Sequence, residues 1–267
     1  MNISEATNDK GGKGMPQWKP YRHDADYSYT LGAFPTFELL DNHPEQVQAI
    51  YMQPSFVEQP AARRAISFAE EHGLELQIDA KTIRRLSPKD NCYLLAVFAK
   101  YDCEPEPINS NLVLVSPSDT GNLGTIMRAM LGFALRDLVI IRPAVDPFDP
   151  RVIRSSMGAI FSLNFAYYDQ LQDYLSAFPS HMRYPFMLDG QYTLEEVGKQ
   201  TSLTDHNVED PFSLIFGNEA AGLDPIFHQL GTSVVIPHEP AIDSLNLPLA
   251  VVIALHEFYQ RRGNILK

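Results

Sequence analysis

The chain has 267 residues, of which 45% are hydrophobic, and a formal net charge of -12 at pH 7. Its length predicts one large or two modest domains, and its apolar content is sufficient for a sizeable core. The acidic balance argues against a protein whose whole surface binds nucleic acid, because phosphate binding requires Lys and Arg. Any RNA-binding surface must therefore be a local cluster of cations.

Two cysteines in a chain of this length do not form a disulfide framework. We expect Cys92 and Cys103 to be reduced, with Cys92 in the core. No segment has the length and apolarity of a transmembrane helix, and residues 1–14 lack the apolar core of a signal peptide. The expectation is a cytoplasmic protein that does not enter a membrane.

Residues 1–26 are expected to form a flexible tail. Residues 8–14 are polar and glycine-rich, but they lack the spacing of a phosphate-binding loop and precede no helix signal. Four aromatic residues follow between charged ones: Trp18, Tyr21, Tyr27 and Tyr29. They have two interpretations, stacking on nucleic-acid bases or packing against the following domain, and the second is favoured.

Short apolar segments in residues 27–101 predict a small α/β domain. The expected helices span residues 34–41, 61–72 and 81–86, and the expected strands span residues 47–52, 74–78 and 92–98. Gly73 follows the second helix and is typical of a helix end. The third helix carries Lys81, Arg84 and Arg85. Two prolines and three acids in residues 102–107 then indicate a linker, placed at residues 102–108.

Strands and helices alternate in residues 109–267, which predicts an α/β fold with a buried parallel sheet. Expected strands span residues 112–115, 138–141, 163–167, 186–188, 214–216 and 234–236. Expected helices span residues 123–135, 149–156, 171–178, 224–230 and 244–262. Asn122 is predicted to be the N-cap of the first of these helices, in which Arg128 lies away from the apolar stripe. Pro248 falls in the first turn of the last helix, where its missing N–H costs nothing, and Gly263 is expected to end that helix.

The strand at residues 214–216 ends abruptly at Gly217, and a second glycine, Gly222, follows five residues later. Loops at the carboxyl ends of strands in open α/β sheets commonly bind ligands, and glycines allow a ligand to approach the backbone. Glu219 is the one charged residue between them. This stretch alone fits either a ligand-binding loop or an ordinary turn between a strand and a helix.

Three motifs occur in order along the second half of the chain. Residues 122–128 read NLGTIMR, residues 215–223 read IFGNEAAGL, and residues 236–246 read IPHEPAIDSLN. Together they resemble the SpoU (TrmH) family of RNA ribose 2′-O-methyltransferases in the SPOUT superfamily. The resemblance covers residues 109–262, including the segment RSSMGA at residues 154–159. Residues 29–101 more weakly resemble the L30e-like substrate-binding domain that often precedes the catalytic one.

The resemblance implies a deep trefoil knot near the C-terminus, which would form a site for S-adenosyl-L-methionine, and a homodimer with its active site near the subunit interface. The substrate would be rRNA or tRNA. The positions that match cofactor contacts in the family are Gly217, Asn218, Gly222, Ile236, Leu245 and Asn246. The positions that match catalytic or site-lining polar residues are Asn122, Arg128, Glu219, Ser244 and Asn246.

The chemistry of methyl transfer constrains these roles. Transfer from a sulfonium to a ribose hydroxyl requires an in-line approach and removal of the hydroxyl proton. An arginine is a poor base because it keeps its proton at any physiological pH. We therefore expect Arg128 to position a substrate phosphate and to stabilise the developing oxyanion, while Glu219 orients Arg128 within one subunit or across the dimer. The alternatives are a structural Glu219–Arg128 ion pair, and simple N-caps at Asn122 and Ser244.

The third motif departs from the family pattern, which commonly has methionine and glycine at the positions of His238 and Pro240. His238 is expected to face solvent. Residues 91–93 also lack the glutamine-glycine pair often seen in the L30e-like domain. These departures and the acidic charge keep a second hypothesis open, a catalytically weakened RNA-binding protein of the same fold. No metal site is predicted, and the missing G-x-G-x-x-G motif argues against a Rossmann oxidoreductase.

Overall fold

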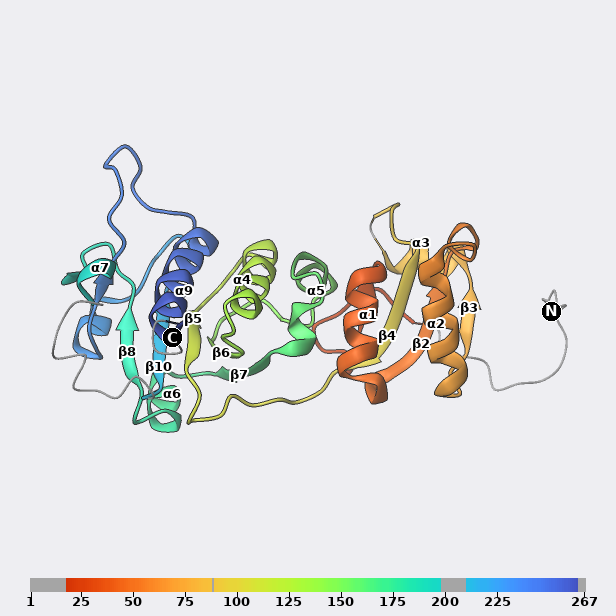
Figure 1. The fold of residues 1–267 in the computed structure, drawn as a ribbon, viewed down its shortest axis with the longest axis horizontal. Coiled ribbons are helices and arrows are strands. Elements are labelled where there is room, and N and C mark those ends of the chain that lie inside the picture. Colours follow the sequence, from red (N-terminus) through yellow and green to blue (C-terminus); the bar gives the residue numbers. More distant parts are fainter. Residues whose placement is uncertain (1–17, 88, 198–209, 264–267) are drawn as a thin grey trace, which may run out of the picture.

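The computed structural model describes residues 18–87, 89–197 and 210–263. They form two main sheets with their own helices, side by side along the long axis of the molecule, and a third sheet of two short strands (Figure 1). We call residues 18–101 the N-terminal unit and residues 109–263 the C-terminal unit. The glycine-rich segment at residues 8–14 and the acids at residues 205–209 lie outside the described residues. Within the described residues, no helix is both long and apolar enough to cross a membrane.

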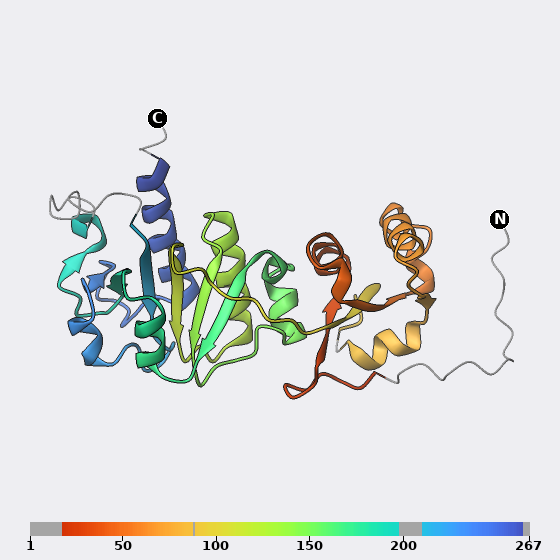
Figure 2. The same cartoon turned by 90° about the horizontal axis from the view of Figure 1, so that it is seen from below.

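The N-terminal unit is built on a four-stranded sheet with the order β1-β4-β2-β3. Its strands are β1 (Tyr27–Leu31), β2 (Val47–Met52), β3 (Leu76–Ile78) and β4 (Leu94–Ala99). Helices α1 (Ala33–Asn42) and α2 (Pro60–Glu71) pack on one face and α3 (Ala80–Leu86) on the other (Figure 2). Two short 3-10 helices, η1 (Pro44–Gln46) and η2 (Pro54–Phe56), flank β2. The predicted strand at residues 47–52 is confirmed with its bounds.

Strand β1 was not predicted, because its polar residues are buried as well as its apolar ones. Ser28 and Thr30 are both fully buried, and Thr30 Oγ1 lies 2.7 Å from Thr36 Oγ1 and accepts a hydrogen bond from Ala96 N. The aromatic residues before and within this strand pack on the unit, as the favoured interpretation expects. Trp18 Nε1, for example, donates to Tyr51 Oη at 3.0 Å. Residues 18–26, assigned to the tail from sequence, are therefore in contact with the folded protein.

The C-terminal unit contains a five-stranded parallel sheet with the order β7-β6-β5-β10-β8. The strands are β5 (Asn111–Val115), β6 (Asp137–Ile141), β7 (Asn164–Tyr168), β8 (Met182–Pro185) and β10 (Phe212–Phe216). A parallel pair, β9 (Tyr192–Thr193) and β11 (Val234–Val235), lies beyond β8. The central strands β5, β6 and β10 are almost entirely buried, as their continuous apolar runs predict for a sheet covered on both faces.

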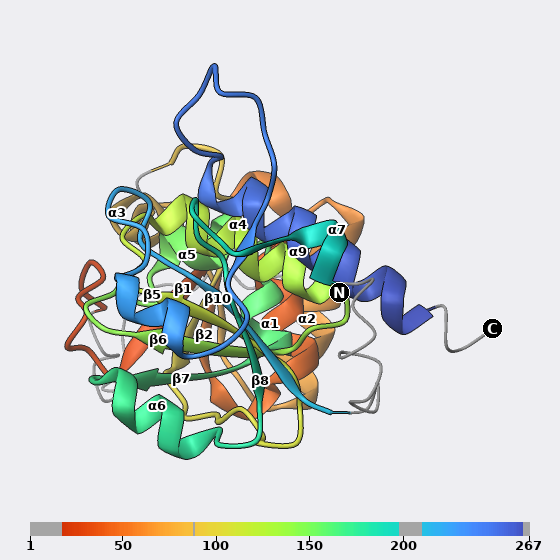
Figure 3. The same cartoon turned by 90° about the vertical axis from the view of Figure 1, so that its left-hand side faces the viewer.

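Helices cover both faces of this sheet. Helices α4 (Thr120–Gly132), α5 (Pro150–Ser155) and α9 (Leu247–Gly263) share one core, and α6 (Leu171–Ala177) with the 3-10 helix η4 (Pro225–Gln229) covers the other face (Figures 2 and 3). The remaining elements are η3 (Ala159–Ser162) and α7 (Leu194–Val197). Pro248 lies in the first turn of α9, as predicted, although that helix begins at Leu247 rather than at residue 244.

Two predicted elements are wrong in place or type. The strand expected at residues 186–188 lies at Met182–Pro185, because the more polar MRYP segment pairs with β10. Phe186 still donates to Ile215 O at 2.8 Å and bridges to Val234, and the strand pairing with β10 ends there. The helix expected at residues 224–230 is the 3-10 helix Pro225–Gln229, whose N-cap Asp224 accepts a hydrogen bond from Ile226 N at 2.9 Å.

The predicted linker, residues 102–108, joins the two sheets and is held against the larger one. Phe165 N donates to Cys103 Sγ at 3.3 Å, and Glu106 N donates to Asp137 Oδ2 at 3.1 Å. The buried His181 ring contacts the linker as well as the sheet. Its Nε2 lies 2.9 Å from the Pro107 carbonyl oxygen, and its Nδ1 lies 2.9 Å from Ser213 Oγ.

Both cysteines are free, and Cys92 is in the core as predicted.

The two units share an aromatic core. Phe98 of β4 packs edge-on against Phe161 of η3, with ring centroids 5.3 Å apart, and also contacts Phe148. Gly158 has a φ of 86°, and a side chain there would lie 2.7 Å from Glu38 Cβ of α1. The closeness of this approach shows that the units meet through a packed interface.

Asp146 is the polar centre of that interface. It is almost fully buried, and its carboxylate accepts from Lys100 Nζ at 2.9 Å, from Phe148 N at 2.8 Å and from the Tyr21 hydroxyl group. One carboxylate thus joins the N-terminal lead-in, the end of β4 and the C-terminal unit.

We expect Asp146→Ala to lower the free energy of unfolding by about 3 kcal/mol, because it leaves the mostly buried Lys100 ammonium without its partner. Chemical denaturation monitored by circular dichroism measures this loss. Asp169→Ala is the matched control, since the exposed Asp169–Arg142 pair contributes at most about 1 kcal/mol. Equal losses in the two variants would contradict the prediction.

Candidate active site at the switch point of the parallel sheet

Strands β5 and β10 are neighbours at the centre of the sheet, with Phe216 opposite Leu114 at their carboxyl ends. The sheet continues from β5 through β6 to β7 on one side, and from β10 to β8 on the other. The order of strands therefore reverses between β5 and β10. Loops that leave a sheet at such a point diverge and leave a crevice between them, which is the usual ligand site of open α/β sheets.

The loop after β10 folds tightly on itself, as its two glycines predict. A Cβ atom on Gly217 would lie 2.1 Å from the backbone carbon of Gly222, so only glycine fits there. Gly222 has a φ of 67°, and its N–H donates to Asn218 O at 2.9 Å. The Asn218 side chain holds the loop from within, because its Oδ1 accepts from the amides of Ala220 and Ala221 at 2.9 and 3.1 Å.

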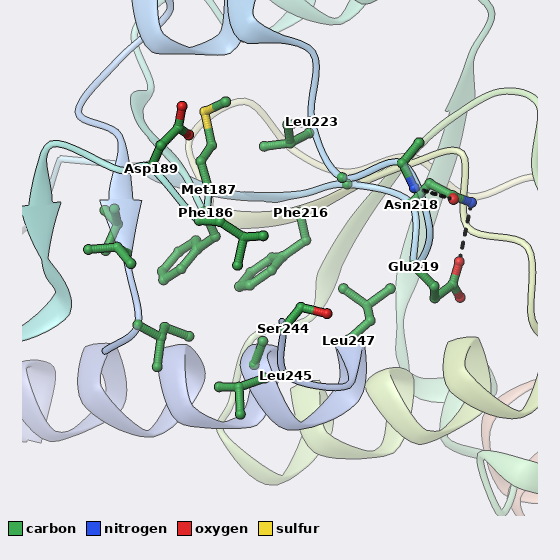
Figure 4. Close-up of a pocket in the computed structure, with 18 of the residues that line it drawn as sticks. Phe186, Met187, Asp189, Phe216, Asn218, Glu219, Leu223, Ser244, Leu245 and Leu247 are labelled. Atoms are coloured by element: carbon green, nitrogen blue, oxygen red, sulfur yellow. Dashed lines mark hydrogen bonds between the residues drawn. The ribbon is translucent and has the colours of Figure 1, made fainter. Parts of the chain in front are cut away.

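Glu219 connects this loop to the segment that follows β5. One carboxylate oxygen accepts from Asn122 Nδ2 at 3.1 Å, and the other accepts from Ser118 Oγ at 2.9 Å. Asn218 Nδ2 reinforces the connection by donating to Ser116 O at 2.8 Å. The two loops of the switch point are therefore joined by side chains of the first and second motifs, Asn122 and Glu219. Figure 4 shows Asn218 and Glu219 on the loop after β10.

The prediction that Asn122 is an N-cap is wrong. The cap of α4 is Asp119, whose Oδ1 accepts from Asn122 N at 2.7 Å, so the helix begins at Thr120. Both residue types cap helices well, and the earlier one captures the first turn. Asn122 is then the third residue of α4, and its side chain is available to donate to Glu219.

The environment of Glu219 favours its ionised form. Partial burial raises the pKa of the carboxyl group, but the hydrogen bonds donated by backbone amides and by Asn122 and Ser118 outweigh that effect and lower the pKa below its usual range. Glu219 therefore carries a negative charge at neutral pH.

A cavity of about 310 Å³ opens beside these loops. Four segments line it, and we call it the switch-point cavity: residues 186–189 after β8, residues 216–223, residues 234–238 with His238, and the start of α9 with Ser244, Leu245, Leu247 and Ala250. Its interior is mostly apolar, and Phe186 and Phe216 stack there with ring centroids 4.4 Å apart. Asp189 and Glu219 lie at opposite ends (Figure 4). A size near 300 Å³ suits a small organic ligand.

The SpoU rRNA Methylase family profile matches residues 109–256, which include every segment that lines this cavity. The chain belongs to the SpoU rRNA Methylase family. The profile covers more than half of the chain and begins two residues before β5.

Curated relatives of this SpoU protein include an uncharacterized tRNA/rRNA methyltransferase of Synechocystis, 29% identical over 68% of this chain and 64% of the relative. A 23S rRNA (uridine(2479)-2′-O)-methyltransferase of Streptomyces viridochromogenes is 30% identical over 55% of this chain. The chain spans only about half of that second relative. Among solved structures, the AdoMet-bound rRNA methyltransferase of Sinorhizobium meliloti matches 88% of each chain with a TM-score of 0.72 and 22% identity, which shows a shared fold.

The switch-point cavity brings together most residues that the sequence singles out. Those that line it are Gly217, Asn218, Glu219, Gly222, Ile236, Ser244 and Leu245. Asn122 reaches the site only through Glu219. Asn246 is exposed outside the cavity and precedes α9, and its carbonyl oxygen accepts from Ala250 N at 3.1 Å.

Arg128 is not at the cavity of its own chain. Its side chain is exposed on α4 and makes no hydrogen bond or ion pair with the residues that the structure describes. The Glu219–Arg128 pair expected within one subunit is therefore absent from this chain, because the Asn122 and Ser118 side chains occupy the carboxylate instead. The six residues from Asn122 to Arg128 rotate Arg128 by about 240° around the helix, away from the cavity.

Two parts of the cavity wall were missed. Residues 186–188 were assigned to a strand and Asp189 to no site, although the Asp189-Gly190 pair is a recognisable turn signal. His238, expected to face solvent, is half-buried and lines the cavity, with its Nδ1 3.0 Å from the carbonyl oxygen of Ile236. The carbonyl two residues earlier in the same loop turns the ring inward.

The lowered pKa of Glu219 predicts how the site responds to acid. The ionised carboxylate stabilises the native protein above the unfolded pKa of about 4.3, and this contribution is lost as pH falls through the lower native value. We expect Glu219→Gln to cost about 1 kcal/mol of unfolding free energy at pH 7 and nothing near pH 3. Denaturation curves of both proteins from pH 8 to pH 3 test this, with Glu239→Gln on a neighbouring exposed loop as control. A difference that persists at the lowest pH would refute it.

Proposed function

We propose that this protein transfers a methyl group from S-adenosyl-L-methionine to a ribose 2′-hydroxyl of rRNA or tRNA. The observation that carries the proposal is the Asn122–Glu219 hydrogen bond, which joins the first two SpoU motifs at the rim of the switch-point cavity. The 23S rRNA 2′-O-methyltransferase activity for which the Streptomyces viridochromogenes relative is named supports the reaction, and the AdoMet-bound state of the Sinorhizobium meliloti structure supports the cofactor.

The residues of the cavity fit the proposed cofactor. S-adenosyl-L-methionine supplies a methyl group on a positively charged sulfonium. The apolar walls, which include Met187, Val234 and Ile236, suit a purine, and the folded Gly217–Gly222 loop exposes backbone to a ligand. The ionised Glu219 carboxylate at one end favours a cation there.

We assign the roles of the polar residues from their places. Glu219, held by Asn122 and Ser118, fixes the loop that borders the reacting end of the cavity. Ser244, in the cavity wall, and Asn246, at the start of α9, present polar groups to the entering ribose. Arg128 holds a substrate phosphate and stabilises the oxyanion. Because its guanidinium keeps its proton, we do not assign proton removal to it.

The position of Arg128 supports a homodimer as the active form. Since Arg128 lies away from the cavity of its own chain, we propose that it serves the cavity of a second copy. An apolar stripe on α9 supports this assembly. Leu249 is 58% exposed and Ile253 is 40% exposed, one turn apart and next to Ala250 in the cavity wall. A dimer that buries this stripe brings a second α4 close to the site, because α4 and α9 pack together.

The chain path around the cavity supports the proposed trefoil knot. The segments before α9 approach each other without room for side chains. A Cβ atom on Gly190 would lie 2.4 Å from the Val234 backbone, and Gly217 contacts Gly222 in the same way. We infer that the C-terminal segment passes through the loop that follows β10 and that this threading forms the cofactor site.

We propose that residues 27–101 are an L30e-like domain that binds the RNA substrate and that residues 109–267 are the methyltransferase domain. Helix α3 and the turn after it supply the local cations that an acidic protein requires. Lys81, Arg84, Arg85 and Lys89 are exposed, and none lies in a salt bridge with a carboxylate of the described residues.

Methyl transfer to RNA from cells that lack the gene tests the proposal. We expect Arg128→Ala to lower the rate by at least about 100-fold, without changing the affinity for S-adenosylhomocysteine, because the proposed contacts of Arg128 are with the RNA. Arg136→Ala, another exposed arginine of the same unit, is the control. Mass spectrometry of the RNA identifies the modified nucleotide.

The outcomes distinguish the hypotheses. Mixing Arg128→Ala with Glu219→Ala chains restores activity if Arg128 acts across a dimer, since each mixed dimer then contains one intact site. Undiminished activity of Arg128→Ala overturns the assigned role. A protein that binds S-adenosylhomocysteine and RNA but methylates nothing supports the weakened RNA-binding alternative.

The cations of α3 make a separate prediction. Replacing Lys81, Arg84 and Arg85 by alanine is expected to reduce the slope of log affinity against log salt concentration by about 2, since each lost phosphate contact contributes about 0.7 for single strands. Filter binding at several salt concentrations measures the slope. Arg63→Ala, on α2 at the opposite face of the sheet, should leave it unchanged. Equal slopes for all three proteins would place the RNA elsewhere.

A further inference from the structure

Asp189 closes the switch-point cavity at the end away from Glu219 (Figure 4). The loop that contains Asp189 packs closely against β11. Met187 N donates to Val234 O at 2.9 Å, and Gly190 N donates to Met187 O at 3.2 Å. Because Gly190 has no side chain, the loop lies directly on the backbone of β11. The position of Asp189 is thereby fixed relative to the cavity wall, although its side chain is 79% exposed.

A chain of polar contacts, two hydrogen bonds and one ion-pair contact, leads to the Asp189 carboxylate. Gln191 N donates to Ser233 Oγ at 3.1 Å, Ser233 Oγ lies 3.0 Å from His228 Nδ1, and His228 Nε2 lies 3.2 Å from Asp189 Oδ1. A Ser233 hydroxyl that donates to Nδ1 places the imidazole proton on Nε2, the ring nitrogen that lies nearer the Asp189 carboxylate. Asp189 Oδ2 has no hydrogen-bond partner among the described residues.

This Ser233–His228–Asp189 arrangement is not a hydrolytic triad. Ser233 is completely buried and no substrate reaches its hydroxyl. His228 does not line the cavity, whereas Asp189 does. Only the carboxylate of Asp189 is accessible from the cavity, whereas the serine is inaccessible. We therefore infer that the network serves to orient Asp189.

We propose that Asp189 accepts hydrogen bonds from the ribose 2′- and 3′-hydroxyls of the methyl donor, and that His228 is its positioning residue. This inference rests on the proposed function and names a binding group of the same site. The reacting sulfonium belongs at the Glu219 end, so the nucleoside extends toward Asp189. Met187 and Val234 give that end an apolar wall suited to adenine, and the ribose adjoins the base. A carboxylate is the group that commonly binds a ribose diol in α/β nucleotide sites.

Isothermal titration calorimetry with two probes tests the assignment. S-adenosylhomocysteine contains the adenosine and an amino acid, whereas 5′-methylthioadenosine contains the adenosine alone. We expect Asp189→Ala to weaken both by a similar factor of about 10 to 100. Glu239→Ala, another exposed carboxylate near the cavity, is the control and is expected to bind both probes as wild type does. Thermal melting confirms that each variant is folded.

The role of His228 has its own readout. His228→Leu should weaken both probes, whereas His228→Gln, whose amide donates from a similar place, should restore most of the affinity. In an Asp189→Ala background, His228→Leu should have no further effect, since it acts only through that carboxylate. Additive losses in the double variant would overturn the positioning role.

The remaining outcomes are decisive in different ways. A loss confined to S-adenosylhomocysteine would assign Asp189 to the amino group of the cofactor and overturn the ribose assignment. Wild-type binding that Asp189→Ala leaves unchanged would overturn this inference alone. A wild-type protein that binds neither probe would overturn the proposed function together with it.

Discussion

The Glu219 carboxylate, which receives hydrogen bonds from Asn122 and Ser118, couples two loops that the chain separates by about a hundred residues. The coupling is possible because β5 and β10 are adjacent and in parallel register, so their carboxyl ends open onto the same crevice. The tight Gly217–Gly222 loop then presents the carboxylate at a defined place. The place of the Glu219 carboxylate thus depends on both the strand order and the two glycines. The walls of the cavity are arranged around this connection.

The acidic charge of the chain is compatible with an RNA substrate when its distribution is considered. Carboxylates such as Asp146 and Asp149 are buried and make hydrogen bonds to neighbouring groups, so they do not repel a ligand from the surface. The cations of α3 are exposed instead. The net charge is a sum over the whole protein, whereas binding to a phosphate backbone depends on the charge of one small part of its surface.

The sequence predicted the parallel sheet and most of the site because both depend on local signals. Continuous apolar runs mark β5, β6 and β10, and the spacing of Gly217 and Gly222 marks the loop. The errors occurred where tertiary contacts outweighed local pattern. Ser28 and Thr30 are polar but buried in β1, and the MRYP segment is a strand because β10 pairs with it.

The site residues show the same division. Asp119 and Asn122 are equally good caps in the sequence, and only the folded chain shows that Asp119 caps α4 while the Asn122 side chain donates to Glu219. Asp189 and His228 are separated by 39 residues and carry no motif, so only the folded chain reveals their contact. Arg128 was placed at the site by its motif, whereas the folded chain leaves it exposed on α4, without a hydrogen bond or ion pair to the residues that the structure describes.

The packed interface between the two units has a consequence for substrate choice under the proposed function. Asp146, Phe98 and Phe161 hold α3 at a set separation from the switch-point cavity. If α3 binds the RNA, only nucleotides at one fixed distance from the bound segment can then reach the cavity. The protein would therefore select its target by the three-dimensional shape of the folded RNA more than by the identity of the modified base.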